Sequence, residues 1–329
     1  MTTIALPHIA APTETPVAAA VRQGLAAHRK WLPAWLFYDA DGSLLFDKIT
    51  RLPEYYLTRT ERDILAARAA EIVAQAAGDA PHARLRIAEL GAGSADKTRL
   101  LLRAAVERQG TLIYEPVDVS SSALQEARER IEREIAGVHV LPRVMNYTEG
   151  LDFYPAAAGE RRMLLYIGSS IGNFEPDEAA DVLGIVRAGL SDGDTLLLGV
   201  DLRKDESTLL AAYNDAAGTT ARFNLNMLAR LNRELDANFD LGAFAHRALW
   251  NAAESRIEMH LESLAAQKVR IAGLDLDVTF AEGERIHTEN SYKYAPGQAE
   301  AMLAAAGFTP ESRWTDARGW FAVHLARAN

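Results

Sequence analysis

The sequence predicts an α/β protein whose core is a mostly parallel, doubly wound sheet of the Rossmann-like type, and three observations carry that prediction. Short apolar runs alternate with longer amphipathic segments between residues 85 and 201, as expected for successive β–α–β units. The runs lack an alternation of polar and apolar residues, which is typical of strands buried on both faces. The first run ends in glycines at 91 and 93, where a strand is expected to turn into a helix.

Taken in order, the predicted core starts with a helix over 60–77, for which Thr58 or Thr60 is a candidate N-cap. Parallel strands are then expected at five places, namely 85–90, 111–118, 138–145, 163–168 and 195–201. Helices are expected to connect them over 96–109, 121–136 and 177–190. The pattern resumes near the C-terminus with a helix and two more strands, over 297–306, 308–314 and 320–327.

Two stretches do not follow this pattern. Residues 204–245 read as helices and 246–293 as antiparallel strands, so we expect an insertion between the fifth strand and the last helix. The N-terminal segment is rich in aromatic residues, which Pro33 and Pro53 prevent from lying on a single helix. We therefore predict a core and a second α+β domain, made respectively of 58–203 with 294–329 and of 1–57 with 204–293.

The composition excludes several classes of protein. The 329 residues include no cysteine, which rules out disulfides, thiolate zinc sites and cysteine nucleophiles. A formal net charge of −10 without a basic block disfavours a nucleic-acid partner. No apolar run has the roughly 18 residues of a membrane helix, and the start lacks the basic residues of a secretory signal. We expect a cytoplasmic, monomeric protein of small-molecule chemistry, without metal, nucleic acid or membrane as partner.

The turn at 91–93 predicts a nucleoside-containing cofactor, with a plain turn as the alternative. Glycines let a ligand approach the backbone, and a helix opening near Ser94 or Asp96 offers unpaired N–H groups. Asp118 closes the next strand at a spacing where a carboxylate can hold ribose hydroxyls. A dinucleotide fingerprint needs glycine at position 96, so E-L-G-A-G instead resembles the first motif of S-adenosylmethionine-dependent methyltransferases with a Rossmann-like core.

Six stretches, in chain order, strongly resemble one family: YDADGSLLFDKITRLPEYYLTRTE, ELGAGSADKTR, GSSIGNF, LLLGVDLRKD, AYNDAAGTTARFNLNML and TENS. This family is the histidine Nα-methyltransferases of ergothioneine biosynthesis, which convert histidine to its trimethylated betaine, hercynine. The resemblance runs from about Trp35 to the C-terminus. It implies S-adenosylmethionine as methyl donor, S-adenosylhomocysteine as product, L-histidine as substrate, and a second domain that binds the substrate.

On the cofactor side, the resemblance implies a role for each matching residue. Gly91 and Gly93 belong to the loop beside the methionine portion, Lys97 contacts its carboxylate, and Asp118 holds the ribose. A carboxylate pairs well with a cation and a diol with a bidentate acceptor, which agrees with these roles. Read without the family, Lys97 is a solvated helix residue.

The adenine contact departs from the family, which commonly has aspartate followed by an aromatic residue. This chain has Asn146 and Tyr147 instead. The amide of Asn146 can still accept from the adenine amine, and Tyr147 can stack on the base.

On the substrate side, Asn173 matches the asparagine that grips the histidine backbone, from the carboxyl edge where open α/β sheets bind ligands. Tyr213 matches the tyrosine on the substrate carboxylate, with Tyr55 in support. A further three residues, Tyr38, Phe46 and Gly168, match positions around the amine. Aromatic faces there can hold a cation that keeps its charge after trimethylation.

Glu289 is the residue that indicates histidine. It and Ser291 match the pair that reads the imidazole, and Met259 matches a residue that packs on the ring. At i and i+2 on an extended strand, the carboxylate and the hydroxyl point to the same side and can satisfy both ring nitrogens. A pocket for indole or phenyl would not favour a buried, unpaired carboxylate. Without the family, Glu289 reads as a surface loop residue.

The expected reaction is attack of the neutral α-amine on the cofactor methyl, with most of the rate coming from in-line placement. The candidate catalytic residues are Tyr38 and Asn173. Tyr38 or a water is the candidate proton relay, but an ordinary tyrosine pKa near 10 leaves the general base unassigned.

Two other readings stay open. The nearer one is an N-methyltransferase of the same fold acting on another aromatic amino acid, such as tryptophan or a prenylated derivative. The farther one is a non-catalytic cofactor-binding module, whose expected mark is the loss of Asp118, Asn173 or Tyr213, and all three are present. An oxidoreductase that uses a nicotinamide cofactor is disfavoured by Asp96.

Overall fold

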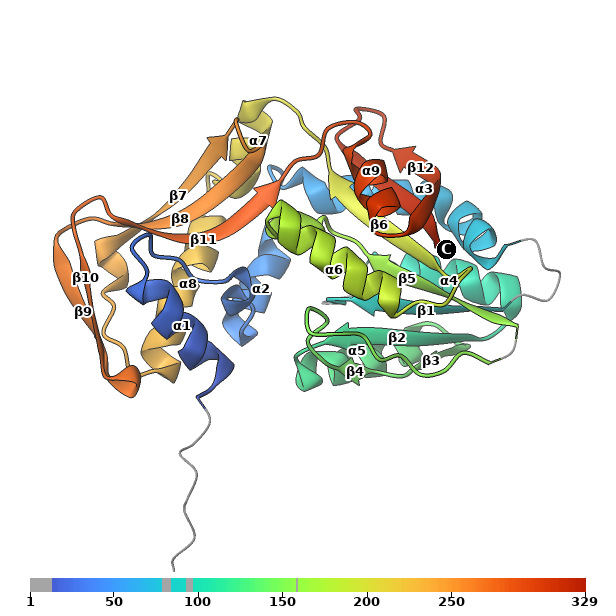
Figure 1. Cartoon of the computed structure of the whole chain (residues 1–329), viewed down its shortest axis with the longest axis horizontal. Helices are drawn as coiled ribbons and strands as arrows, with labels where there is room; N and C mark the ends of the chain where they lie inside the picture. Colours follow the sequence, from blue (N-terminus) through green and yellow to red (C-terminus); the bar gives the residue numbers. More distant parts are fainter. Residues whose placement is uncertain (1–13, 79–83, 93–96, 158) are drawn as a thin grey trace, which may run out of the picture. The chain divides into compact units, whose positions relative to one another are not determined.

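The computed structural model describes residues 14–78, 84–92, 97–157 and 159–329 (Figure 1). It divides into two compact units, which we describe separately. The core unit comprises Phe46–Thr220, Ala248–Glu258 and Asn290–Asn329. The second unit comprises Met1–Leu45, Ala221–Arg247 and Met259–Glu289. The predicted division into a methyltransferase core and a substrate domain follows other bounds, and it stays a prediction.

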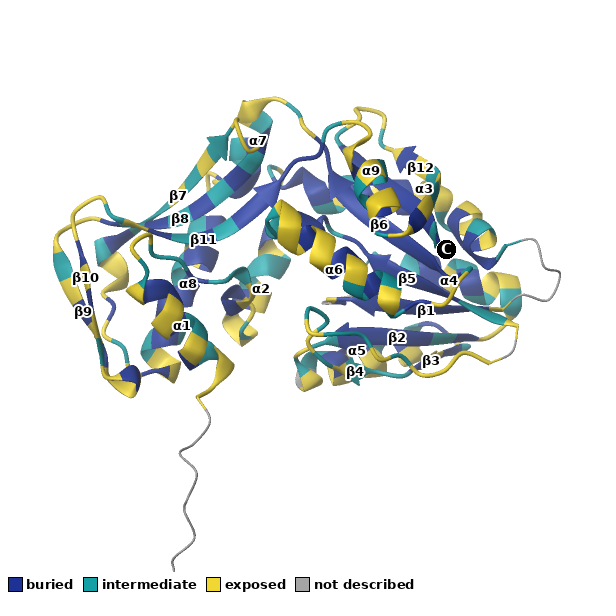
Figure 2. Ribbon diagram, in the orientation of Figure 1, coloured by how far each residue is buried: buried dark blue, intermediate teal, exposed yellow. Residues whose placement is uncertain are grey.

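The core unit is built on one sheet with strand order β12-β13-β6-β5-β1-β2-β3, and β4 also pairs with β2. Neighbours from β6 to β3 run parallel, whereas β13 is antiparallel to β6 and to β12. The strands are β1 (Arg84–Leu90), β2 (Leu112–Asp118), β3 (Val138–Val140), β4 (Arg143–Val144), β5 (Glu160–Tyr166), β6 (Thr195–Asp201), β12 (Phe308–Thr315) and β13 (Phe321–Ala328). This confirms the predicted mostly parallel sheet, and Figure 2 shows its central strands as buried.

Helices cover both faces of this sheet, as the doubly wound pattern predicts. One apolar cluster packs α3 (Tyr56–Ala77) and α4 (Thr98–Gln109) against the sheet, together with Ile131 of α5 (Ser121–Glu134). The cluster on the other side contains side chains of α6 (Pro176–Ala188) and α9 (Gln298–Ala305). The sheet is therefore packed between two separate apolar clusters.

Local signals explain the start of α6, whereas the cap predicted for α3 is wrong. Helix α6 starts at a capping box formed by Glu175 and Glu178, with proline at its first position. Helix α3 begins at Tyr56, ahead of both threonines proposed as its cap. The Thr60 hydroxyl instead donates to the Tyr56 carbonyl at 2.9 Å, as threonines inside helices do.

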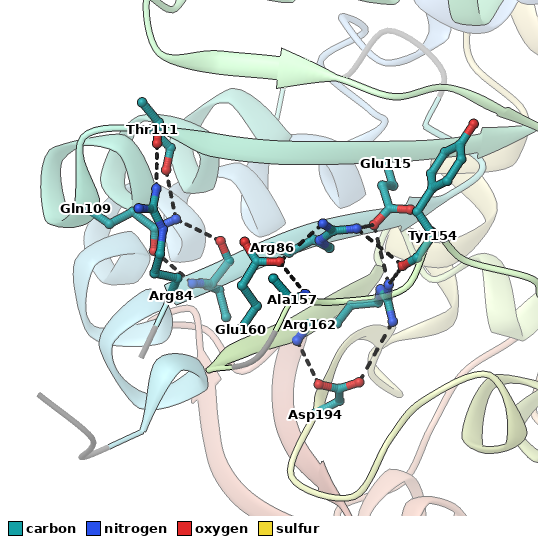
Figure 3. A network of polar contacts seen from close by, with 11 residues as sticks. Arg84, Arg86, Gln109, Thr111, Glu115, Tyr154, Ala157, Glu160, Arg162 and Asp194 are labelled. Carbon is teal, nitrogen blue, oxygen red and sulfur yellow. Dashed lines mark hydrogen bonds and ion pairs between the residues drawn. The ribbon is translucent and has the colours of Figure 1, made fainter. Parts of the chain in front are cut away.

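A buried ionic network, which we call the amino-end network, lies toward the amino-terminal ends of β5 and β6 (Figure 3). Its members are Arg86, Glu115, Tyr154, Glu160, Arg162 and Asp194. The fully buried Glu115 accepts from Arg86 at 3.1 Å and from Arg162 at 3.5 Å. Its other oxygen accepts from the Tyr154 backbone N–H at 3.1 Å. The strands and the following loop are thus joined by charged hydrogen bonds.

The second unit combines helices with antiparallel strands, as expected for the insertion. The helix α1 (Pro16–Ala26) starts after Thr15, whose hydroxyl accepts from the Ala18 N–H at 3.2 Å. Strands β9 (Gln267–Ile271) and β10 (Leu276–Phe280) form an antiparallel hairpin, with Asp275 at φ 50° in the turn.

The remaining elements cross the boundary between the units or lie beside it in the chain. They are α2 (Ala40–Ile49), α7 (Glu206–Tyr213), α8 (Thr219–Glu234), and the sheet β11-β8-β7 of Arg285–Tyr292, Arg256–Ser263 and Phe244–Asn251. Strand β7 begins in the stretch that was predicted to be helical. Within the described residues, no helix is long and apolar enough to span a membrane.

Candidate active site at the carboxyl edge of the core sheet

The carboxyl ends of the parallel strands carry the predicted cofactor residues of the core unit. Gly91 follows β1, and Asp118 ends β2. Gly168, predicted for the substrate amine, follows β5 closely, and Asp201, to which the sequence analysis gave no role, ends β6. Open α/β sheets bind ligands at this edge, because the loops that leave it can surround a small molecule. Gly93, also predicted to contact the cofactor, lies outside the described residues.

Two glycines leave room at this edge. Gly91 has φ 64°, a conformation that favours glycine, and a Cβ built there would meet no atom of the described residues within 4 Å. Gly168 has φ 84°, and a Cβ there would lie 3.4 Å from the Lys97 Nζ. The chain thus keeps open space beside Gly91, as close approach of a ligand to the backbone requires.

Lys97, the predicted partner of the cofactor carboxylate, forms an ion pair with Glu61 of α3. Glu61 is fully buried and accepts the Gly168 N–H on both carboxylate oxygens, at 2.8 and 3.0 Å. A Cβ at Gly199 would clash with this carboxylate, so the glycine in β6 makes the space that Glu61 occupies. The sequence analysis missed Glu61 as a site residue, because an acid in a helix gives no sign of its distant partner.

The predicted ribose and adenine residues lie after β2 and β4. The Asp118 carboxylate accepts from the Ser120 N–H at 2.9 Å, and burial raises the pKa of this carboxyl group. Tyr147 packs edge-on against Tyr166 with ring centroids 5.8 Å apart. The Asn146 carbonyl accepts from the Thr148 hydroxyl at 2.8 Å, so an adenine amine would have to share that oxygen.

Asn173 closes a short 3-10 helix, Ser170–Asn173, that follows β5. The residue before it, Ser169, is buried with φ 60°, and its hydroxyl accepts the Asp201 N–H at 2.9 Å. A Cβ at Gly172 would lie 3.0 Å from the Tyr292 carbonyl oxygen. Close backbone packing and a strained serine therefore fix the turn that carries Asn173.

Tyr213 and Ser291, both predicted to contact substrate, belong to one buried network that we call the carboxyl-edge network. Its members are Tyr56, Asp201, Lys204, Tyr213, Ser291 and Lys293. The Tyr213 and Ser291 hydroxyl oxygens lie 2.6 Å apart. Two lysines and an aspartate that the sequence analysis did not assign to the site thus lie directly behind two predicted substrate residues.

This network shifts the pKa values of its own groups. Burial lowers the pKa of Lys204 to about 8, against the opposing effect of Asp201. Burial and then Asp201 raise the pKa of Tyr56 far above its ordinary value, so Tyr56 stays a hydroxyl. The Tyr56 hydroxyl donates to Asp201 at 2.7 Å and accepts from Lys204 at 2.7 Å.

The predicted aromatic residues of the core unit lie close to that network. Tyr55 packs edge-on against Tyr213 with centroids 6.3 Å apart, and Phe46 packs edge-on against Tyr55 at 6.2 Å. Such edge-to-face pairs stabilise ring positions. The structure therefore brings Phe46, Tyr55, Tyr213 and Ser291 together through successive contacts.

Three predicted substrate residues belong to the second unit. Tyr38 is 45% exposed, and its ring packs edge-on against Phe223 at 5.8 Å. Met259 of β8 is buried, and its carbonyl accepts from the Thr288 hydroxyl of β11 at 3.0 Å. Glu289 follows on β11 and is half-buried, so it lies in a strand and not in a surface loop.

Glu89, the acid of the E-L-G motif, is a buried group beneath the cofactor edge. It accepts from the Thr98 hydroxyl at 2.7 Å and from the Tyr114 hydroxyl. Burial raises its pKa to about 7. Within the described ranges, no group of three or more His, Cys, Asp or Glu side chains could hold a metal ion.

A glycine after β1, a carboxylate at the end of β2 and polar groups after β5 and β6 define a Rossmann-like, nucleoside-cofactor-binding enzyme of the methyltransferase class. The chain belongs to the histidine-specific, S-adenosylmethionine-dependent methyltransferases, whose family model matches residues 17–328.

Curated relatives agree with this family. The chain is 47% identical over 306 residues to a histidine N-alpha-methyltransferase of Mycolicibacterium smegmatis and 45% identical over 306 residues to one of Mycobacterium tuberculosis. Each match covers 93% of this chain and 93% of the relative. The chain is also 30% identical to ergothioneine biosynthesis protein 1 of Neurospora crassa, over 86% of this chain and 32% of that protein.

Proposed function

We propose that the protein transfers methyl groups from S-adenosylmethionine to the α-amine of L-histidine and that three transfers give hercynine, the first step of ergothioneine biosynthesis. The observation that carries this proposal is the match of nearly the whole chain to the histidine-specific family. The relatives that are 47% and 45% identical are named for the same reaction.

The carboxyl edge of the core sheet fits the cofactor. S-adenosylmethionine supplies a methyl group activated by a sulfonium. The space at Gly91 admits the methionine portion, and Asp118 accepts from the ribose hydroxyls. Lys97, which pairs with Glu61, also contacts the methionine carboxylate. Gly93 continues the glycine turn, and Asn146 and Tyr147 contact the adenine.

Asn173 binds the histidine backbone, and Tyr213 binds its carboxylate with Tyr55 behind it. Phe46, Gly168 and Tyr38 border the amine. Met259 packs on the imidazole ring, and Glu289 with Ser291 reads its nitrogens. Of these residues, only Asn173 and Gly168 lie outside the proposed substrate domain, residues 1–57 and 204–293.

Tyr38 and Asn173 act mainly by positioning the substrate amine and not by removing its proton. The α-amine must be neutral for each transfer, and an ordinary tyrosine pKa near 10 makes Tyr38 a poor base. We therefore assign Tyr38 and Asn173 to placing the nitrogen in line and Tyr38 or a water to relaying its proton. Aromatic walls tolerate the growing bulk and the permanent charge of the trimethylated amine.

Mass spectrometry after incubation with histidine and S-adenosylmethionine tests the reaction. We expect a gain of three methyl groups on histidine and release of S-adenosylhomocysteine. Tandem fragmentation should place all three on the α-nitrogen. No gain with histidine would overturn the proposal.

The rival substrate is tryptophan or another aromatic amino acid. Glu289→Ala should weaken histidine turnover strongly, because the imidazole N–H then loses its carboxylate acceptor. Unchanged histidine turnover in this variant would show that Glu289 does not read the ring.

We also propose a monomer that works in the cytoplasm on a free amino acid, without a nucleic-acid or membrane partner. Light scattering behind a sizing column tests the first part. A mass near the 36.0 kDa of one chain is expected.

A further inference from the structure

Lys293 is a fully buried lysine directly behind two predicted substrate residues. Its ammonium donates to the Tyr213 hydroxyl oxygen at 2.9 Å and to the Ser291 hydroxyl oxygen at 2.7 Å. It also pairs with the Asp201 carboxylate at 2.9 Å, with both side chains 0% exposed. Burying an ammonium is costly unless it is paired and hydrogen-bonded, so this placement needs a compensating role.

A count of protons shows what Lys293 does to its neighbours. An ammonium has three protons and accepts no hydrogen bond, and its three partners account for all three protons. Both hydroxyl oxygens therefore accept from Lys293. The oxygens of Tyr213 and Ser291 lie 2.6 Å apart and share one hydroxyl proton. The pair's second hydroxyl proton must go to an acceptor other than these residues.

Neutralising Asp201 does not by itself explain Lys293. The other oxygen of Asp201 already accepts from the Lys204 ammonium at 2.6 Å, and Tyr56 donates to Asp201 as well. The backbone of Lys293 is fixed too, because its N–H donates to the Ser255 carbonyl at 2.8 Å. The ammonium is thus held rigidly against the two hydroxyl groups from behind.

We propose that Lys293 is a positioning residue that orients the Tyr213–Ser291 hydroxyl pair so that the remaining proton of the pair is donated to histidine. The inference rests on the proposed function and adds a residue behind the substrate contacts. Ser291 then donates to the Tyr213 oxygen, and Tyr213 donates to the substrate carboxylate. A hydroxyl that accepts from an ammonium is also a stronger donor toward an anion, because successive hydrogen bonds polarise one another.

The test is Lys293→Met, which keeps the length of the side chain and removes the donors. The histidine KM should rise about tenfold or more, because a hydrogen bond to a charged group loses its fixed geometry. kcat should change much less, and the Kd of S-adenosylhomocysteine, measured by calorimetry, should stay the same. Lys293→Gln, with two N–H donors, should restore part of the KM.

Histidinol, in which a hydroxymethyl group replaces the carboxylate, provides a second readout. The wild type should bind histidine more tightly than histidinol, and this ratio of Kd values should shrink toward one in Lys293→Met. A merely structural role for Lys293 would leave the ratio unchanged, and that result overturns the inference. The double variant with Tyr213→Phe should be hardly worse than Tyr213→Phe alone.

The outcomes separate the two levels of the proposal. A wild type that methylates histidine, together with an unchanged KM and an unchanged histidinol ratio in Lys293→Met, overturns the role of Lys293 alone. A wild type that does not methylate histidine overturns the proposed function and this inference with it. If Lys293→Met does not fold, Lys293→Gln is read by the same two quantities, and unchanged values overturn the inference.

Discussion

Two buried polar networks lie at opposite ends of the same sheet, and they differ in how their charges are used. The amino-end network joins Arg86 and Arg162 to three carboxylates and to backbone groups of the loop around Tyr154 (Figure 3). The carboxyl-edge network joins two lysines and one aspartate to the hydroxyl groups of Tyr56, Tyr213 and Ser291.

The difference indicates what each end of the sheet is for. Arginine donates in a rigid fork and pairs well with carboxylates, so the amino-end network ties strands to a loop. A hydroxyl group both accepts and donates, so a hydroxyl whose oxygen accepts from an ammonium keeps its own proton to donate to another group. We therefore propose that the amino end stabilises the fold, whereas the carboxyl edge presents hydrogen bonds to a ligand.

The largest effect that separates the two networks is expected for Glu115→Gln. This carboxylate is fully buried and accepts from two arginines, so its removal takes one carboxylate partner from each of two buried cations. We expect a loss of about 3–5 kcal/mol in the free energy of unfolding. Urea titration measures the loss, and steady-state kinetics should show an unchanged histidine KM. A large rise in KM without loss of stability would contradict the comparison.

The second effect concerns Glu89, a buried carboxyl group that belongs to neither network. Its pKa is about 7 in the folded chain and 4.5 ordinarily, so between these values the folded state holds a proton that the unfolded state has released. Its contribution to stability is therefore present at low pH and lost as the pH rises through 7. The pKa difference corresponds to about 3 kcal/mol.

Glu89→Gln tests this sign. The unfolding free energy of the variant minus that of the wild type should increase by about 3 kcal/mol between pH 4.5 and pH 8. Urea titrations at both pH values give this difference. Glu107→Gln, at an exposed position of α4, is the control and should show a flat difference. A flat difference for Glu89→Gln as well would disprove the protonated state.

The third effect compares two tyrosines, one in each network. Tyr213→Phe removes a hydroxyl that we assign to the substrate carboxylate. The binding free energy of histidine should weaken by about 1.5–3 kcal/mol, so its KM should rise about 10- to 100-fold. Tyr154 contributes only backbone atoms to the amino-end hydrogen bonds described above, so Tyr154→Phe is the matched control with an unchanged KM. Equal KM values in the two variants would remove the functional distinction between the networks.

The buried apolar strands could be predicted from the sequence, whereas the buried pairs of charged residues could not. The run TLLLGVD predicts β6 over 195–201 without error, because every residue in it is buried. The run MLLYIG places the fourth predicted strand at 163–168, but β5 spans Glu160–Tyr166. The strand starts earlier because the amino-end network pairs Glu160 with Arg86 and Arg162 with Glu115. These partners are far away in the chain, so they give no local signal.

The candidate site shows the same limit. Glycines and a strand-end acid indicated the cofactor edge, since these patterns are local. Lys293, Asp201 and Glu61 were missed, because each acts through a partner that is distant in sequence. One error had a local signal in the sequence. A single strand was predicted over 138–145, but Leu141 and Pro142 separate β3 from β4, and a proline inside a strand indicates such a break.

The smallest effect uses two glycines that share a backbone conformation. Gly91 and Gly110 have φ 64° and 81°, and within the part of the chain that the structure describes, a Cβ at either would meet no atom within 4 Å. Alanine at each should therefore cost a similar strain, about 1–2 kcal/mol of stability. Only Gly91→Ala should also weaken S-adenosylhomocysteine, by about tenfold in Kd, because its Cβ fills the space through which a ligand approaches the backbone. Calorimetry on both variants measures this, and equal affinities would mean that the space beside Gly91 is not used by the cofactor.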